Sequence, residues 1–339
     1  MSLAEDSRVE QVTRTVVDWF ADNARPLPWR EPGTSAWGIL VSEVMSQQTP
    51  MTRVAPRWLA WMDAWPTPAD LAAAPTSEVL LAWDTLGYPR RALRLQECAQ
   101  AVVDRFDGEV PADEETLLDL PGIGAYTAAA VASFAHGRRT TVLDVNVRRV
   151  LSRVFDGIQH PPTALSKKET RWASRFVPDT DHVAWNAGTM ELGAVVCTSR
   201  NPACDTCPLA AHCGWLAAGR PAAPARKPRT QAWAGTDRQL RGAIMKVLRN
   251  ASAAGPAPGA PSDPPGTVPV RLFTVSTSEF TETDEAAAEA LPEAVRTAWS
   301  VVRELGTAER ISGLVADLVN DGLAVRRTTA DGTQVLALP

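Results

Sequence analysis

Apolar residues recur three and four positions apart through most of residues 1–215, and this is the period of an amphipathic α-helix. In the stretch 36–49, for example, Trp37, Leu40 and Val44 fall on one helical face. Alternating patterns that would predict strands are almost absent from this part of the chain. We therefore expect a mainly α-helical domain at 8–215. Its principal helices are predicted at 8–22, 36–49, 52–65, 77–86, 91–106, 126–136, 145–155 and 181–196.

The pattern changes after residue 215, where proline, glycine and basic residues become frequent. This composition predicts a basic, proline-rich linker at 216–236. The remaining segment, 237–339, is expected to form a small α+β module with a winged-helix-like order of elements. Its predicted elements are a helix near 237–250, a flexible Pro/Gly-rich segment at 251–268, a strand at 269–276, helices at 285–304 and 307–321, and a β-hairpin that turns at Ala330-Asp331-Gly332.

The composition narrows the class of protein. The chain has 339 residues, of which 45% are hydrophobic, so it can form two or three globular domains. It contains no run of about 18 uncharged apolar residues, and we therefore expect no membrane contact. The first residues are polar and acidic, unlike a secretion signal. We expect a cytoplasmic protein, in a reducing compartment where disulfides rarely persist.

The net charge of −5 argues mildly against a nucleic-acid partner. Its distribution weakens that objection, because residues 270–339 carry 11 acidic and 6 basic residues and therefore the whole excess. The other residues are balanced and contain arginine clusters such as Arg90, Arg91 and Arg94. Such clusters can bind phosphate even when the total charge is acidic. An ordinary solvated surface is the alternative for each of them.

Four of the five cysteines fall within seventeen residues, with the spacing C-x6-C-x2-C-x5-C. Four thiols in a reducing compartment indicate zinc or an iron–sulfur cluster rather than two disulfides. Zinc sites favour paired C-x2-C segments, and only one such pair occurs, so the uneven spacing favours a cluster. Cys98, the fifth cysteine, lies in a predicted amphipathic helix and is expected in the core. The four clustered residues are Cys197, Cys204, Cys207 and Cys213.

The stretch LPGIGAYTAAAV at 120–131 places Gly122 and Gly124 in a tight turn between two predicted helices. Pro121 ends the first helix. Backbone amides at the start of the second helix can hold a phosphate without a charged side chain. The pattern is that of a helix–hairpin–helix, and a plain helical connector is the alternative. Such a hairpin reads no bases, so its contact with DNA is expected to be independent of sequence.

Together, this hairpin, LDVNVRRVL at 143–151 and the four-cysteine spacing resemble the helix–hairpin–helix DNA glycosylase superfamily over about residues 8–215. In that superfamily the four cysteines ligate a [4Fe–4S] cluster, so the resemblance implies this cofactor in a loop at 197–213. Its lyase members carry a lysine two residues after the second hairpin glycine, and here that position holds Tyr126. A phenol cannot form an imine, which predicts a monofunctional glycosylase. Tyr126 is expected either to hydrogen-bond near a catalytic carboxylate or to pack in the core.

Hydrolysis of a purine N-glycosidic bond needs an acid for the leaving base and negative charge beside the sugar cation. Glu43 is the only acid on an otherwise apolar predicted helix, so desolvation should raise its pKa. Asp144 immediately precedes a predicted helix and is the second candidate. A simple helix cap is the alternative for Asp144, and it can serve both purposes.

The segments LPWR (27–30), SEVMSQQT (42–49) and GYPRRALRL (87–95) resemble the MutY-type, A/G-specific adenine glycosylases in particular. The resemblance implies that Glu43 protonates adenine, that Asp144 stabilises the sugar cation and that Asn146 orients Asp144. The other residues that the resemblance implies in DNA or base contacts are Leu27, Trp29, Arg30 and Glu191 around a flipped adenine, Gln47, Gln48 and Tyr88 beside the opposite base, and Gly122, Gly124 and Arg148.

Several positions depart from the pattern of that family. Pro89, Val145 and Ser46 replace residues that are frequent there, namely tyrosine, glycine and leucine. In addition, residues 237–339 do not resemble the Nudix-like domain with which many adenine glycosylases read 8-oxoguanine. Strict preference for 8-oxoguanine over guanine is therefore not implied for this chain.

The sequence thus predicts a monofunctional adenine DNA glycosylase of base excision repair. Its expected substrate is double-stranded DNA in which adenine is mispaired with 8-oxoguanine or guanine, and it would associate with the nucleoid when bound. We expect a monomer whose C-terminal module could bind a repair protein. Two alternatives remain at this point, a thymine-mismatch or damaged-pyrimidine glycosylase of the same fold, and a non-catalytic DNA-binding scaffold.

Overall fold

The computed structural model of the chain describes residues 3–223, 233–254 and 266–339. It divides into two compact units. The first consists of residues 1–62, 66–68 and 100–227, and the second of residues 63–65, 69–99 and 228–339. No helix within the described ranges is long and apolar enough to cross a membrane.

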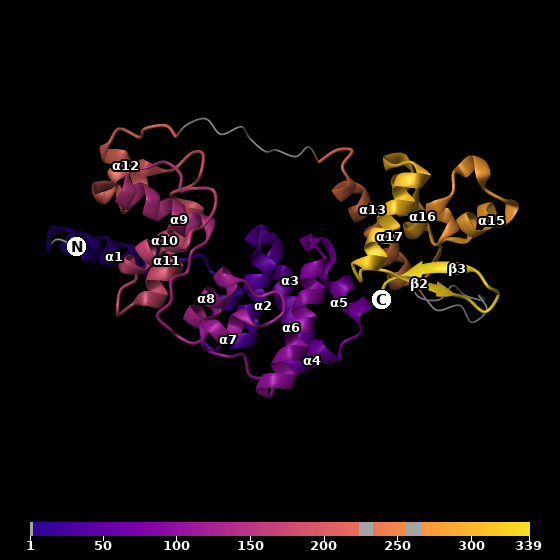
Figure 1. Ribbon diagram of the computed structural model, residues 1–339, viewed down its shortest axis with the longest axis horizontal. Helices are drawn as coiled ribbons and strands as arrows, with labels where there is room; N and C mark the ends of the chain where they lie inside the picture. The colour runs from indigo at the N-terminus through magenta and orange to yellow at the C-terminus, as the bar shows by residue number, and fades with distance from the viewer. Residues whose placement is uncertain (1–2, 224–232, 255–265) are drawn as a thin grey trace. The chain divides into compact units, whose positions relative to one another are not determined.

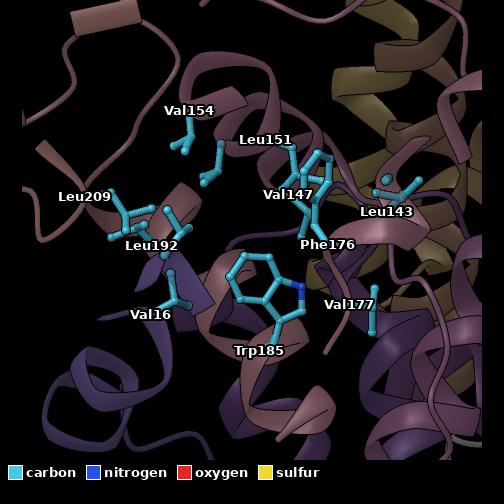
Figure 2. Close-up of a cluster of buried hydrophobic side chains, with 13 residues drawn as sticks. Val16, Leu143, Val147, Leu151, Val154, Phe176, Val177, Trp185, Leu192 and Leu209 are labelled. Carbon is cyan, nitrogen blue, oxygen red and sulfur yellow. The ribbon is translucent and has the colours of Figure 1, made fainter. Parts of the chain in front are cut away.

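The first unit has a helical core built on α11 (His182–Val195), which packs against α1 (Leu3–Asn23) and α9 (Val145–Leu151). The apolar faces of these helices meet around Trp185. Figure 2 shows the Trp185 indole among the other side chains of this buried cluster, including Leu192. Burial of large apolar side chains is the main stabilising contribution of such a core. The other helices that lie wholly in this unit include α10 (Lys167–Ala173) and α12 (Gly214–Ala217).

The helix–hairpin–helix lies in the same unit and is confirmed. It consists of α7 (Glu114–Leu118) and α8 (Ala125–Phe134), and α8 also packs on α2 (Ala36–Ser46). Gly122 has a φ of 76°, a left-handed conformation that favours glycine, and Gly124 caps the start of α8. The buried face of α8 is formed mainly by alanines, so α8 can approach α2 closely. The approach brings residues of α2 and the start of α8 to one site.

The second unit contains the C-terminal module. Its longest helices in the described residues are α13 (Asp237–Ala254), α16 (Glu293–Leu305) and α17 (Ala308–Asn320), with α13 packed on both of the others (Figure 1). Three antiparallel strands are arranged in the order β1-β3-β2, and Val268 pairs with Leu336. Along the chain, the described residues of the module form one α-helix, a short strand, four further α-helices and a two-stranded hairpin. The winged-helix-like order that the sequence predicts has only two helices between the strand and the hairpin. The strands are β1 (Val268–Pro269), β2 (Val325–Thr328) and β3 (Gln334–Ala337).

The second unit also includes residues 69–99 of the predicted glycosylase region. Here α13 contacts α5 (Thr76–Trp83). Arg249 of α13 lies 3.7 Å from a carboxylate oxygen of Asp84, and Arg90 lies 3.3 Å from Asp321. The C-terminal module is therefore joined to helices that the sequence assigns to the glycosylase region. The other helices with residues in this unit include α4 (Pro68–Ala73) and α6 (Arg90–Phe106), while α3 (Met51–Ala64) begins in the first unit.

Two sequence predictions for the module are wrong. The strand expected at 269–276 is present only as the two residues of β1, and α14 (Arg271–Thr274) follows. The single helix expected at 285–304 is two helices, α15 (Glu282–Ala290) and α16, because Pro292 precedes α16. Of the predicted linker and flexible segment, residues 224–232 and 255–265 lie outside the described residues.

Candidate active site and iron–sulfur loop

A large open cleft of about 1420 Å³ lies in the first unit. Residues of α2, the hairpin, α8 and the start of α9 form one part of its lining. Residues 20–34 and α11 form another part. Most of the sequence-predicted catalytic and base-contacting residues line this one cleft, namely Leu27, Trp29, Arg30, Glu43, Gln47, Gln48, Gly122, Gly124, Tyr126, Asp144, Asn146, Arg148 and Glu191.

Glu43 lies on α2 and is only 8% exposed. The helix begins at a cap in which the Ser35 side chain accepts from the Gly38 amide, 3.1 Å away. The Tyr126 hydroxyl donates to Glu43 Oε2 over 2.7 Å. The pKa of Glu43 is raised to about 7, mainly by burial. The nearby charge of Asp144 also raises this pKa, whereas the hydrogen bond from Tyr126 and the charge of Arg30 lower it. A carboxyl with this pKa can carry a proton near neutral pH and release it.

Tyr126 is the second residue of α8, directly after the hairpin. Burial and the neighbouring charges of Glu43 and Asp144 raise its pKa well above the usual value. Its hydroxyl therefore stays protonated and acts as a hydrogen-bond donor. Of the two positions expected from the sequence, the structure has the first, a hydrogen bond to the candidate catalytic carboxyl.

Asp144 caps the start of α9. Its Oδ1 accepts from the amides of Asn146 and Val147 at 2.8 and 2.7 Å, and its Oδ2 accepts from the Asn146 side-chain amide at 2.7 Å. Burial raises the pKa of Asp144, while these hydrogen bonds from Val147 and Asn146 oppose the rise. The carboxylate is thus both a helix cap and a fixed group on the cleft wall.

Asn146 connects Asp144 to the cysteine loop through Arg149, a residue that the sequence did not single out. Arg149 donates 2.7 Å to Asn146 Oδ1, and to the backbone carbonyls of Gly193 and Cys197, also at 2.7 Å. A Cβ at Gly193 would lie 2.7 Å from that of Asn146, so glycine permits the contact between α9 and α11. The only sequence signal for Gly193 was the small residue in MELGA.

Glu191 lies on α11 and is 1% exposed. Its Oε1 pairs with Arg25 at 2.5 Å and its Oε2 with Arg30 at 2.9 Å. Burial raises the pKa of Glu191, but the hydrogen bonds from Arg25 and Arg30 outweigh burial, so its pKa lies below the usual value. Arg25 is a further residue that the sequence analysis did not predict in the site. Its position two residues before the LPWR segment could have indicated it.

The remaining predicted contact residues differ in position. Gln48 is exposed with a φ of 54°, and the Gln47 amide donates 3.3 Å to Thr127. Tyr88 belongs to the second compact unit. Arg148 was expected to contact DNA, but its guanidinium is buried and pairs with Glu169 at 2.6 Å. Arg148 therefore holds α9 to α10 in this structure instead of offering a free charge to phosphate.

The four clustered cysteines line one small cavity in the first unit, together with apolar residues such as Leu192. None of the four forms a disulfide. Within the described ranges no three His, Cys, Asp or Glu side chains are close enough together to hold a single metal ion. Arg153, which is 1% exposed, donates 3.2 Å to Cys197 Sγ and 2.8 Å to the Thr198 carbonyl. A buried cation at this point favours thiolate ligands, which fits an iron–sulfur cluster.

A helix–hairpin–helix that presents a tyrosine to a buried glutamate, followed by this cysteine loop, is the architecture of an iron–sulfur DNA glycosylase. The profile of the HhH-GPD superfamily of base excision DNA repair proteins matches residues 41–174. The profile of the iron–sulfur binding domain of endonuclease III matches residues 197–213. Both matches fall on the regions that form the cleft and the cysteine cavity.

Individual relatives narrow the family. The adenine DNA glycosylase of Mycolicibacterium smegmatis is 51% identical over 237 residues, which cover 70% of this chain and 80% of that protein. The adenine DNA glycosylase of Homo sapiens is 41% identical over 208 residues, 59% of this chain and 38% of that protein. The chain therefore belongs to the adenine DNA glycosylase family, and it binds a [4Fe–4S] cluster through the loop at 197–213.

Solved structures agree with the fold. A thermostable thymine-DNA glycosylase has a TM-score of 0.59 at 27% identity, covering 63% of this chain and 99% of that chain. A trapped endonuclease III–DNA covalent intermediate has a TM-score of 0.54 at 23% identity and covers 63% of this chain and 97% of that chain. The second likeness concerns the fold alone.

Proposed function

We propose that this chain hydrolyses the N-glycosidic bond of adenine mispaired with 8-oxoguanine or guanine, without a lyase step. The observation that carries the proposal is the buried Glu43 carboxyl, which has a pKa of about 7 and a hydrogen bond from Tyr126 in a cleft shared with Asp144. The choice of adenine as the excised base rests on the family, because the relatives named above are adenine DNA glycosylases.

In this proposal Glu43 supplies the proton that neutral adenine needs in order to leave. The bond between the sugar C1′ and adenine breaks, its electron pair goes to the base, and the proton of Glu43 goes to the same base. Asp144 faces the sugar cation that remains, and a water molecule adds to C1′ while one of its protons passes to the Asp144 carboxylate. The hydrogen bonds from Val147 and Asn146 keep Asp144 oriented during this step.

Tyr126 supports the monofunctional assignment. Its hydroxyl donates to Glu43 and its pKa is raised, so it offers no amine and no ready phenolate to attack the sugar. The [4Fe–4S] cluster is proposed as structural, holding the loop beside α9. An adenine stacked in a duplex cannot reach Glu43, so the base must be flipped into the cleft.

Recognition of the opposite base is proposed for Gln47, Gln48 and Tyr88, and the two glutamines line the same cleft. We propose that the enzyme acts as a monomer. Residues 237–339 do not resemble a Nudix-like domain, so discrimination between 8-oxoguanine and guanine would depend on the catalytic region and its neighbours.

One observation favours a second candidate. A thymine-DNA glycosylase is among the solved structures of this fold, and a thymine/uracil-DNA glycosylase of Pyrobaculum aerophilum is 32% identical over 201 residues. Removal of thymine from a mismatch is therefore the alternative that an assay must include.

The test is a single-turnover assay on three labelled duplexes, with adenine opposite 8-oxoguanine, adenine opposite guanine, and thymine opposite guanine. Adenine-strand breaks that appear mainly after alkali treatment are expected, and the ratio of the two adenine rates measures the preference for 8-oxoguanine. Breaks in the thymine duplex alone would replace adenine as the substrate. Strong cleavage before alkali would contradict the monofunctional assignment.

Glu43→Gln tests the proton donor, because the amide keeps the shape of the side chain and loses the acidic proton. We expect cleavage to fall by at least about a hundredfold, the usual contribution of a general acid, while DNA binding is retained. Glu31 also lines the cleft but is exposed, so Glu31→Gln is the matched control and should cleave normally. Normal cleavage by Glu43→Gln would remove Glu43 from the mechanism.

A further inference from the structure

The second unit contains a ladder of alternating aromatic rings and guanidinium groups. The Arg238 guanidinium lies over the Trp233 ring at 5.2 Å and over the Tyr88 ring at 4.7 Å. Arg91 lies over the same Tyr88 ring at 5.6 Å and over the Trp83 ring at 5.2 Å. Trp233 and Arg238 come from the start of the C-terminal module, whereas the other three residues lie in and after α5. The ladder therefore joins two distant segments of the chain.

The backbone holds Tyr88 outward. Gly87 and Tyr88 both have positive φ, 79° and 49°, a conformation that is strained for tyrosine. Arg91 donates 3.1 Å to the carbonyls of Leu86 and Gly87, and Trp83 Nε1 donates 2.9 Å to Gly87. These bonds fix the turn, and they leave the Tyr88 side chain exposed on a rigid support, at 44%. Strain of this kind in a non-glycine residue is typical of binding sites.

Arg238 differs from the other arginines of α13. Arg241 pairs with Asp321 and Asp317, and Arg249 pairs with Asp84, so these two fasten the helix within the unit. Arg238 is exposed, its guanidinium lies over two rings, and within the described part of the chain it forms no ion pair with a carboxylate. Its N–H groups are thus free to bind a further anion, although the module around it is acidic overall.

Trp233 also indicates a binding surface, because its ring is 56% exposed and lies beside the Arg238 guanidinium. Exposed aromatic rings interleaved with arginine are the chemistry with which proteins hold nucleic acid that is locally unstacked. The rings stack on bases or sugars, and the guanidinium binds a phosphate. An acidic peptide would also suit the guanidinium, but it would leave the exposed Trp233 ring without a further stacking partner.

We propose that Trp233 and Arg238 add a DNA-binding surface beside Tyr88, whose DNA contact the family resemblance already implies. Through this surface the C-terminal module would hold the substrate duplex, with Arg238 on a backbone phosphate. The proposal deepens the proposed function and rests on it only for the identity of the duplex. It gives the C-terminal module a part in substrate binding that does not require a Nudix-like domain.

The test measures binding of the full chain carrying Glu43→Gln to a fluorescent duplex with adenine opposite 8-oxoguanine, over a series of salt concentrations. Addition of Arg238→Ala should weaken binding about three- to tenfold and reduce the slope of log K against log salt by about one, as for one lost phosphate contact. Trp233→Ala should weaken binding without changing the slope. Arg238→Lys should keep the slope but bind less tightly, since lysine cannot stack as a plane.

Lys246→Ala is the matched control, because Lys246 is an exposed cation on the same helix with no contact to the ladder. It should bind as the parent protein does. If Arg238→Ala and Lys246→Ala behave alike while both remain folded by circular dichroism, the surface does not contact DNA. This outcome is independent of the proposed function, which is decided by adenine cleavage and not by the salt dependence of binding.

Discussion

Removal of the Tyr126 hydroxyl should shift the pH dependence of the reaction, whereas a variant that is only less well folded should lose activity equally at all pH values. The Tyr126 hydroxyl donates 2.7 Å to Glu43, and this hydrogen bond stabilises the charged carboxylate. It lowers the pKa of Glu43 and thereby opposes burial, which raises the pKa. Tyr126→Phe removes the donor and leaves the burial, so the pKa of Glu43 should rise above about 7.

The expected shift is about one pKa unit. A hydrogen bond to a charged group contributes about 1.5 kcal/mol, and one pKa unit corresponds to about 1.4 kcal/mol. Glu43 acts in its protonated form, so activity is lost as pH rises through its pKa. The alkaline limb of the rate profile should therefore move to higher pH by about one unit, and the variant should lose less activity than the parent between neutral and mildly alkaline pH.

The assay is the single-turnover rate of adenine removal measured from about pH 6 to about pH 9 for both proteins, with saturating enzyme. Thermal midpoints measured over the same range control for loss of folding. A uniform drop in rate with an unmoved alkaline limb would mean that Tyr126 only positions the site. A limb that moves to lower pH would refute the assigned balance between burial and the hydrogen bond.

Three other perturbations test the structure around the site. The pKa of Glu43 is about 7 in the folded protein and 4.5 ordinarily, so between these pH values the folded parent protein binds more protons than the unfolded one and loses stability as pH rises. Glu43→Gln has no such proton to lose, so above pH 7 it should gain up to about 3 kcal/mol of stability relative to the parent protein. Urea unfolding of both proteins at acidic and alkaline pH measures this difference. Gly193→Ala places a Cβ 2.9 Å from backbone of α9 and should cost about 1–3 kcal/mol in thermal unfolding, whereas Gly242→Ala on an open helical surface should stabilise by about 1 kcal/mol. Arg153→Ala removes the donor to Cys197 and should lower the iron content severalfold; unchanged iron and visible absorption would show that the guanidinium does not hold the cluster loop.

Helical periodicity predicted the elements of the first 215 residues closely. The helix predicted at 91–106 is α6, Arg90–Phe106, and the one predicted at 181–196 is α11, His182–Val195. α6 has a clear apolar face, which makes the helical period visible in the sequence. α11 is apolar over most of its length and is recognised by the length of its apolar run. Other predicted ends differ by more, because the helix predicted at 8–22 is α1, Leu3–Asn23, and the helix predicted at 36–49 ends at Ser46. The sequence therefore predicted that these helices exist better than it predicted their ends.

The C-terminal errors have a local cause. PVRLFTVS is rich in β-branched and aromatic residues, but only Val268 and Pro269 pair with β3, and the following residues turn into α14. Propensity favoured a strand there, and packing of α14 on α17 prevailed. The helix predicted at 285–304 ignored Pro292, although proline has no amide for a helix interior and commonly marks a helix start.

The candidate acid, Glu43, could be identified from the sequence, but the side chains that contact it could not. A lone glutamate on an apolar helix is conspicuous, and desolvation of its carboxyl follows from the pattern alone. The partners of the site residues are far apart along the chain. Tyr126 is 83 positions from Glu43, and Arg25 is 166 positions from Glu191. No periodicity connects such pairs, because they are brought together by the packing of whole helices.

The same limit explains why the cysteine loop looked separate from the site in the sequence. Arg149 donates to Asn146, which holds Asp144, and also to the carbonyls of Gly193 and Cys197. The start of α9 and the first cysteine are thus positioned by one buried guanidinium. Loss of the cluster would release the loop carbonyl from Arg149 and leave that cation under-satisfied, which is costly in a buried position. Loss of the cluster from the loop should therefore displace Asp144 in the active site, although none of the described cysteines lines the cleft.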